Sequence, residues 1–318
     1  MLSYALRRVL LGLLTVGLVS AMIFFAVEAL PGDACTAVLQ RDAHGQRLEN
    51  CRREMGLDRP AVARYLDWVG GAIRGDLGAS AGSGKPITEL VGARLANTLM
   101  LAGLSMAVGV PLALLLGVVT ALARDRAADL ALSTAAILAM TIPEFVTATL
   151  LIFTFSVWLG WVPGIVLASA DAPVSALFPT IWLPVAVLTM VMTAHILRTV
   201  RSSMIDVMAG DFVQMARLKG VPAWRVVWRH ALPSALLPAI NVVALTVAWL
   251  LGGVVVVEKV FNYPGLGRFM VDSITERDLP VVQGLALVVA SAYVGVNLAA
   301  DLLALLLDPR LRTARLRA

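Results

Sequence analysis

Glu144 has the strongest claim to a chemical role, because it interrupts a long apolar stretch. It follows Pro143 near the middle of the run Leu130–Trp158. Proline leaves a carbonyl of the preceding turn without its helical hydrogen bond, and such breaks often line cavities. The carboxyl of Glu144 could meet a cationic group of a ligand or pair with a residue of another chain. The alternative is a structural pairing or a protonated, hydrogen-bonded carboxyl.

A second polar pair lies in another apolar run. Asp301 follows Asn297 by one helical turn, so the two share a helix face. Together with Pro143 and Glu144, they are candidates for lining a path through apolar surroundings. For Asn297, Asp301 and His195, hydrogen bonds that hold helices together are the more expected role.

A Gly- and Ser-rich segment, Ala79–Pro86, contains Gly-Ser-Gly-Lys and resembles a phosphate-binding loop. Such a loop needs Gly at its first position and Ser or Thr after the Lys, but these positions hold Ala79 and Pro86. We therefore interpret the segment as a flexible loop, and any nucleotide must bind to another polypeptide. The sequence offers neither a Ser/His/Asp set nor paired carboxylates in one outward segment, so hydrolysis is not expected.

The elements that position these residues are membrane spans. Of the 318 residues, 59% are hydrophobic and only 15% are charged, whereas soluble proteins carry about 25% charged residues. This composition excludes a soluble enzyme, a disordered chain and a nucleic-acid-binding domain. A spanning helix needs about 20 mainly apolar residues. Six stretches qualify: Val9–Leu30, Ala96–Ala123, Leu130–Trp158, Ile181–Leu197, Leu236–Val257 and Gln283–Leu307.

Basic residues between the spans predict the orientation. Fourteen Lys and Arg residues lie at the termini and in alternate connectors, whereas the short connectors on the other side hold only Lys259, Arg268 and Arg277. Because basic loops stay in the cytoplasm, both termini are predicted to be cytoplasmic. The first span is predicted to be an uncleaved anchor. The predicted parts are 1–30, a tail and first span; 31–95, an external loop domain; 96–307, a five-helix core; and 308–318, a cytoplasmic tail.

The two cysteines, Cys35 and Cys51, both lie in the predicted external loop. That side is oxidising, so we expect a disulfide between them. With only His44 nearby, a metal site is much less expected.

The connector between the fourth and fifth spans is too polar to cross a membrane. Phe212, Met215, Ala216 and Lys219 have helical spacing, and Trp224, Val227, Trp228 and Ala231 form a second stripe. Gly220 and Pro222 separate the two stripes. The pattern predicts two short amphipathic helices joined by a fixed bend. They would either lie on lipid headgroups or dock in a groove of a partner.

This connector resembles the EAA motif of permeases in binding-protein-dependent ABC importers. That motif is Glu-Ala-Ala, three residues, Gly, nine residues and Ile-x-Leu-Pro. Ala216, Gly220, Leu232 and Pro233 match it, whereas Gln214, Met215 and His230 depart from it as in the dipeptide/oligopeptide/nickel branch. Further matching segments run from residue 4 to residue 310: Tyr4–Arg8, Leu30–Asp33, Met55–Asp58, Asp76–Ser80, Glu258–Phe261, Pro264–Gly267, Arg277–Gln283 and Asp308–Arg310.

The resemblance implies an all-α integral membrane protein with six transmembrane helices and the type I ABC importer permease fold. Its external loop between the first two helices would be helical or irregular. It implies a multi-pass protein of the bacterial cytoplasmic membrane that takes up a small solute, most readily a di- or oligopeptide, by alternating access. Residues 206–233 would be the coupling element, with the ATPase-coupling residues Asp211, Gln214, Ala216, Gly220, Trp224, Trp228, His230, Leu232 and Pro233.

The implied partners are a second homologous permease subunit, two cytoplasmic ATPase subunits, an extracytoplasmic solute-binding protein and the lipid bilayer, but no nucleic acid. This chain would hold no cofactor or metal, since ATP and Mg²⁺ would bind to the ATPase subunits. Two alternatives remain: a secondary transporter, or a structural membrane subunit without ATPase partners. Nickel chelates and glutathione are alternative solutes.

Overall fold

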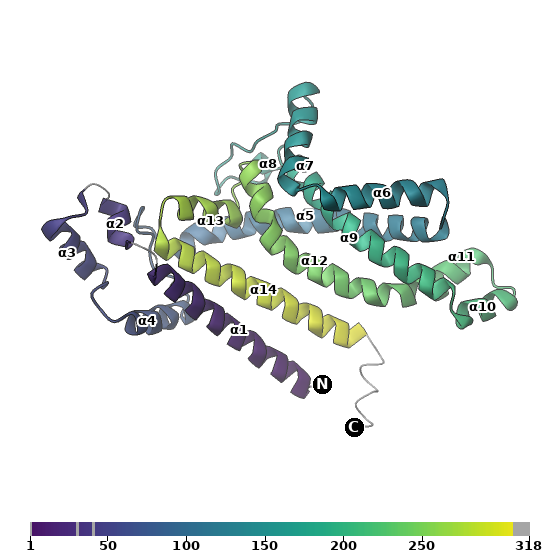
Figure 1. The fold of residues 1–318 in the computed structure, drawn as a ribbon, viewed down its shortest axis with the longest axis horizontal. Coiled ribbons are helices and arrows are strands. Elements are labelled where there is room, and N and C mark those ends of the chain that lie inside the picture. The colour runs from purple at the N-terminus through teal and green to yellow at the C-terminus, as the bar shows by residue number, and fades with distance from the viewer. Residues whose placement is uncertain (1, 30–31, 40–41, 308–318) are drawn as a thin grey trace.

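The computed structural model describes residues 2–29, 32–39 and 42–307, except for some side chains in α1, α2, α12 and α14. Every regular element in this part is helical. Long helices run side by side along the molecule, with α2 and α3 at one end and α10 and α11 at the other (Figure 1). The long helices are α1 (Leu2–Glu28), α5 (Ile87–Leu122), α9 (Trp182–Met208), α12 (Leu232–Val260) and α14 (Leu279–Leu307).

Four of these helices are long and apolar enough to cross a membrane: α1, α5, α9 and α14. The predicted single span Leu130–Trp158 is instead broken. It consists of α6 (Ala127–Thr141), α7 (Glu144–Leu151) and the π-helical η2 (Ile152–Trp158), and the two halves meet at 107°. Together they are a fifth candidate span. The predicted span Leu236–Val257 falls in α12, where several side chains lie outside the described part, so this span stays a prediction.

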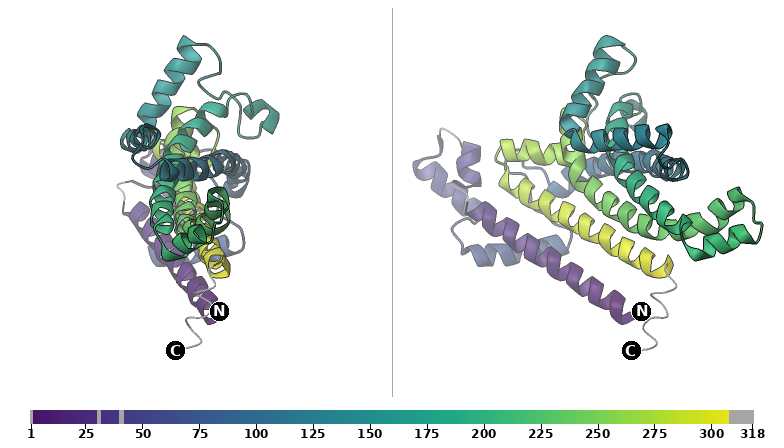
Figure 2. Two further views of the ribbon diagram at one scale, coloured as in Figure 1. Left: turned by 90° about the vertical axis from the view of Figure 1, so that its right-hand side faces the viewer. Right: turned by 45° about the vertical axis from the view of Figure 1, so that its right-hand side comes forward.

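Pro143 explains the break. It lacks an N–H to donate and forces the residue before it out of the helical region. Ile142 accordingly has ψ of 126° and ends α6. The next helix, α7, then begins at Glu144. Figures 1 and 2 show the chain turning sharply at this proline, with α7 crossing the direction of the long helices instead of continuing α6.

The core is built around α9, which packs against α5, α6 and α12. Glycines of α5 allow the close approach of α9: a Cβ on Gly117 would lie 2.7 Å from the Cβ of Val200. Thr193 also donates from Oγ1 to the carbonyl of Gly109, at 3.4 Å. Small residues and such hydrogen bonds are how apolar helices associate without a hydrophobic driving force.

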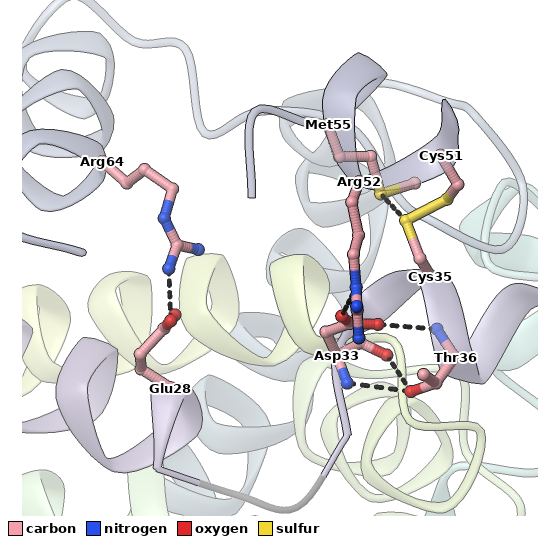
Figure 3. A network of polar contacts seen from close by, with 8 residues as sticks. All are labelled: Glu28, Asp33, Cys35, Thr36, Cys51, Arg52, Met55 and Arg64. Carbon is pink, nitrogen blue, oxygen red and sulfur yellow. Dashed lines mark hydrogen bonds and ion pairs between the residues drawn. A yellow bond between two sulfur atoms is a disulfide. The ribbon is translucent and has the colours of Figure 1, made fainter. Parts of the chain in front are cut away.

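The segment predicted to be external forms a small helical unit of α2 (Ala34–Leu39), α3 (Gly45–Glu54) and α4 (Ala61–Ile73). Cys35 and Cys51 are joined by a disulfide that ties α2 to α3, with the thioether of Met55 3.6 Å from the Cys35 sulfur (Figure 3). Asp33 caps α2, since its carboxylate accepts the amide of Thr36 at 2.8 Å and the guanidinium of Arg52 at 2.6 Å.

Burial acts to raise the pKa of the Asp33 carboxyl, but the Thr36 amide and the Arg52 guanidinium outweigh it, so this pKa lies below its usual range. Because the ionised form is the one that is stabilised, the cap is strongest at neutral pH. The external unit is thus held by a disulfide and by a charged helix cap.

Candidate functional site

The connector between α9 and α12 forms a bend with a defined backbone. It consists of α10 (Asp211–Leu218), α11 (Ala223–Arg225) and the π-helical η3 (Val226–Ala231). The amide of Gly220 donates to the carbonyl of Arg217 at 3.0 Å, and that of Val221 donates to Ala216 at 3.1 Å. This pair of bonds is the Schellman motif, which needs a residue of positive φ at its centre. Gly220 has φ of 75°, which explains why glycine occupies this position.

The inner face of this bend packs against the hydrophobic core of the helical bundle. Val213, Val226 and Ala231 are fully or almost fully buried and belong to the same cluster as Val200 and Met204 of α9. Ala216 and Val221, the two ends of the Schellman bond, pack against this cluster as well. A displacement of the bend would therefore be transmitted to α9 and α12 rather than absorbed.

The outer face of the bend carries apolar side chains that are exposed in this chain. Leu218 is 83% exposed and Trp224 is 63% exposed. The guanidinium of Arg225 lies 5.4 Å from the ring centre of Trp224. Tryptophan and arginine are the residues enriched at the energetic centres of protein interfaces. The exposed apolar face consists of Phe212, Met215, Leu218, Trp224 and Trp228.

The remaining predicted coupling residues flank this bend. Gln214 donates from Nε2 to the carbonyl of Ala209 at 3.1 Å and so caps the end of α9. A carboxylate could not donate this bond, which gives a local reason for glutamine here. Asp211 is in the first turn of α10, where a negative charge is favourable. His230 is half-buried, and Leu232 and Pro233 begin α12.

Sequence analysis missed an ion pair that joins α9 to α6 near the bend. Arg201 donates from Nε and Nη2 to the two carboxylate oxygens of Asp129, at 2.6 and 2.7 Å. The Asp129 side chain is only 5% exposed and also accepts from the hydroxyl of Ser133. Bidentate pairs of this kind fix orientation as well as distance. No sequence motif connects these residues, which are 72 positions apart.

Glu144 lies at the break in the third span, at the first position of α7. Within the described part of the chain, its buried Oε2 has no hydrogen-bond partner. The helix α7 packs against α9 and α12. The carboxyl is therefore held near the core, and one of its oxygens accepts no hydrogen bond from the described residues.

Asn297 and Asp301 are not shown to join Glu144. Asn297 donates from Nδ2 to the carbonyl of Tyr293, at 2.9 Å, within its own helix. That helix, α14, packs against α1, α12 and α13 (Leu266–Thr275). The side chain of Asp301 lies outside the described part of the chain. Within the described part of the chain, Pro143 and Glu144 thus lie at the start of α7, whereas Asn297 lies on a different helix, α14.

A polar cavity of about 490 Å³ lies along the second half of α9, toward the bend. It is lined by one helical stripe, His195, Arg198, Thr199, Ser202, Ser203 and Asp206, and by Met140 of α6. Arg198 contacts the sulfur of Met140 at 3.8 Å. In the described part of the chain, neither Arg198 nor Asp206 forms an ion pair, so both charges are available. Only His195 of this group was singled out from the sequence.

A buried carboxylate lies near the end of α12. Glu258 belongs to one of the sequence motifs, but the motif gave no reason for a carboxylate at this position. Glu258 is fully buried at the end of α12. It accepts from the hydroxyl of Thr98 at 2.6 Å and from the amide of Arg268 at 3.0 Å. The Thr98 oxygen in turn accepts the amide of Leu266 at 2.9 Å. Glu258 and Thr98 therefore cap α13 from two other helices.

Two glycines make this cap possible. A Cβ on Gly265 would lie 2.0 Å from Oε1 of Glu258, and one on Gly267 would lie 2.6 Å from the Cα of Val255. The Pro-Gly-Leu-Gly motif is thus a close-packing requirement. Tyr263 adds to the same cluster, because it is fully buried and its hydroxyl donates to the carbonyl of Asn97 at 3.0 Å.

The Gly- and Ser-rich segment beside this cap is not the flexible loop that we predicted. Its amides at Ala81 and Gly82 donate to the carboxylate of Asp278, at 3.1 and 3.3 Å, as does the hydroxyl of Ser80 at 2.6 Å. Successive backbone amides form an anion-binding concavity. Here the anion is a side chain of the same chain, so the segment holds α14 rather than a phosphate.

Comparisons with known proteins agree along the whole chain. The family described as "Binding-protein-dependent transport system inner membrane component" matches residues 109–313, and the corresponding N-terminal family matches residues 1–101. The chain is 37% identical over 313 residues to the glutathione transport system permease protein GsiC of Escherichia coli O6:H1, covering 98% of this chain and 99% of the relative. Proteins of the same name from Escherichia coli K12 and Shigella dysenteriae are 36% identical over the same shares.

Proposed function

Because the chain belongs to the binding-protein-dependent transport system inner membrane components, it is a permease subunit of an ABC importer, and we propose that it takes up a short peptide. Membership in this family decides against the secondary transporter and the structural subunit considered above. The family is one of membrane permeases of the bacterial inner membrane, not of enzymes. ATP is hydrolysed by ATPase subunits, and an external binding protein delivers the solute.

The relatives are named for glutathione, which is a tripeptide. Glutathione is therefore the first solute to test, followed by di- and oligopeptides, with nickel chelates as the remaining class. The measurement is calorimetric titration of the cognate binding protein with glutathione and with dialanine. Submicromolar binding of either peptide supports the proposal, and binding of a nickel chelate alone contradicts it.

We propose that residues 206–233 couple the ATPases to the spans. The observation that carries this proposal is the contrast between the two faces of the bend. Its inner face is buried against α9, whereas Trp224 and Trp228 are exposed on the outer face. In the proposed cycle, two ATPase subunits close on ATP and push this apolar face. The push switches a pathway shared with a second permease subunit from inward-facing to outward-facing. In this topology both termini lie in the cytoplasm.

The bend also explains why the coupling can be mechanical. A lever transmits displacement only if its joint does not yield, and the Schellman motif at Gly220 fixes the joint by two backbone hydrogen bonds. Thermodynamic reciprocity then requires that a loaded binding protein also favours the closed ATPase pair.

The test replaces Gly220 with valine. A β-branched residue at a φ of 75° is strained by about 1–2 kcal/mol, although no atom lies within 4 Å of the new Cβ. We expect the bend to reorganise, so that ATP hydrolysis by the purified complex in liposomes continues while peptide uptake falls about tenfold.

Gly75→Val is the matched control, because Gly75 also has positive φ, 87°, and open space around it but lies in the external segment. It should leave the ratio of uptake to hydrolysis unchanged. Normal coupling in the Gly220 variant would contradict the role of the bend.

For the solute path, we propose two places. Glu144 would meet the amino group of a peptide at the break in the third span, with Pro143 setting the break. The stripe of α9 from His195 to Asp206 would form the inner mouth of the path. Roles for Asn297 and Asp301 in the path remain part of this proposal, on α14.

A further inference from the structure

The external helix α4 has three different faces. Tyr65 and Trp68 point to α1, and they form a cluster with Phe24 whose ring centres lie 5.4 to 6.4 Å apart. A second side carries charges, with Arg64 paired to Glu28 and Asp67 paired to Arg59 at 2.7 Å. The third side is apolar and exposed: Val62, Leu66 and Ile73 are 60%, 63% and 82% exposed. Their spacing of four and seven residues places them on one stripe.

The contacts of Tyr65 set the depth of α4. Its hydroxyl lies 2.9 Å from Oγ of Ser20 and 3.4 Å from the carbonyl of Gly17. These residues precede Glu28, the last residue of α1, by 8 and 11 positions. At 1.5 Å per residue, Tyr65 reaches about 12–16 Å below the outer end of a membrane-spanning helix. A helix in contact with this part of α1 lies within the thickness of the outer leaflet.

The exposed stripe of α4 continues an exposed apolar surface of α1. On α1, Leu18 and Met22 are 63% and 65% exposed, on a helix that is apolar enough to span. Phe25 belongs to the same stripe of α1 and touches Tyr65, with ring centres 5.7 Å apart. The exposed apolar side of α1 therefore runs directly into α4.

The charged side of α4 fits the same placement. The Arg64–Glu28 ion pair lies at the outer end of α1, where headgroups begin (Figure 3). A helix with an apolar side toward the acyl chains and charges toward water is the arrangement of interfacial helices, which sink about 5–10 Å into the boundary.

We propose that α4 is an interfacial helix whose exposed side, Val62, Leu66 and Ile73, is buried in the outer leaflet of the lipid bilayer. The external unit is then not wholly in water. Its disulfide-linked helices α2 and α3 are attached to the membrane surface through α4, while the charged side of α4 remains open to the aqueous side, where a binding protein docks.

The test uses single cysteines labelled with bimane in the complete importer in nanodiscs. The native cysteines are bonded to each other, so a new cysteine is the only free thiol of this chain, and the importer without the new cysteine gives the background labelling of the partner subunits. Leu66→Cys probes the apolar stripe, and Ile73→Cys is a second probe in case the first impairs assembly. Asp67→Cys is the matched control, next in sequence but on the charged side and 62% exposed.

We expect lipids brominated on the acyl chain to quench bimane at position 66 or 73 by at least about half, and aqueous iodide to quench it little. Bimane at position 67 should instead be quenched strongly by iodide and little by the brominated lipids. Efficient iodide quenching at 66 and 73 would place the stripe in water and overturn the proposal. Weak quenching by both agents would mean that a protein covers the stripe, and would overturn it as well.

Discussion

At the scale of single residues, Glu258 shows how a buried carboxylate can be stable next to a membrane. Its oxygens accept from the amide of Arg268, in the first turn of α13, and from the hydroxyl of Thr98. The carboxylate therefore joins α5, α12 and α13 at one point on the outer side.

This contact predicts a strong dependence on Gly265. Because φ at this residue is negative, alanine is allowed by the backbone, and the nearest obstacle is the carboxyl of Glu258, whose Oε1 would lie 2.0 Å from the new Cβ. We expect Gly265→Ala to displace the carboxylate and to cost about 2–3 kcal/mol, seen as a lower thermal midpoint of the purified complex.

A double-mutant cycle separates this cause from others. In the Glu258→Ala background the obstacle is gone, so Gly265→Ala should add little further loss, with a coupling of about 1 kcal/mol or more. Gly17→Ala, where no atom lies within 4 Å of the new Cβ, is the control and should be nearly neutral. Additive effects of the two substitutions would show that the carboxylate is not what excludes alanine.

At the scale of elements, the break at Pro143 changes the direction of the third span, and the hydrophobicity pattern does not predict this change. The apolar residues continue on both sides of it, so composition alone predicts one straight crossing. A missing N–H and one extended residue, Ile142, turn α7 by 107°. The turn also leaves Glu144 at the first position of α7.

Replacing this proline should straighten the element. In Pro143→Ala, alanine can donate to the preceding turn, so we expect α6 and α7 to join more often into one helix. Spin labels at Leu138→Cys and Leu150→Cys, both on exposed positions, report the change. Their separation should rise toward the about 18 Å of a continuous helix.

The matched control is Pro111→Ala in α5, which already runs through its proline without a break. It should leave the separation of the two labels unchanged. An unchanged separation in Pro143→Ala itself would mean that packing, and not the proline, sets the bend.

At the scale of the whole molecule, α9 connects the bend at one end with the core in the middle. Most of its apolar window is buried. Its exposed cytoplasmic stripe is polar and lines a cavity of about 490 Å³. A push on the bend therefore reaches the residues that line the proposed inner mouth without an intermediate element.

If this stripe lines a water-filled path, Ser202→Cys should react with charged thiol reagents from the cytoplasmic side. Position 202 is four residues from both Arg198 and Asp206, so the two charges act on it from the two adjacent turns. We expect Arg198→Gln to slow an anionic reagent relative to a cationic one, and Asp206→Asn to do the opposite, each by about threefold. The measurement is the labelling rate in inside-out vesicles.

Leu138→Cys on α6 is the lipid-facing control, since it is 54% exposed and apolar in its surroundings. It should react slowly with both reagents. If Ser202→Cys behaves like Leu138→Cys, the stripe faces lipid or another subunit and is not part of the path.

The sequence by itself determined the class of the protein. Apolar runs long enough to span, basic connectors and a collinear set of motifs predicted a helical membrane permease, and the family matches agree. These features are local in sequence, because a span needs only length and apolarity, and the bend at Gly220 needs only hydrogen bonds between near neighbours. Such local patterns can be recognised in the sequence before the fold is known.

Tertiary structure alone decided which distant residues meet. The Arg201–Asp129 pair, the cap of α13 by Thr98 and Glu258, and the anchoring of the Gly-rich segment by Asp278 join residues from 10 to nearly 200 positions apart. The orientation of α4 against α1 belongs to the same class. Such contacts depend on how helices pack, and packing is set by side chains of several elements at once. No single stretch of sequence carries that information.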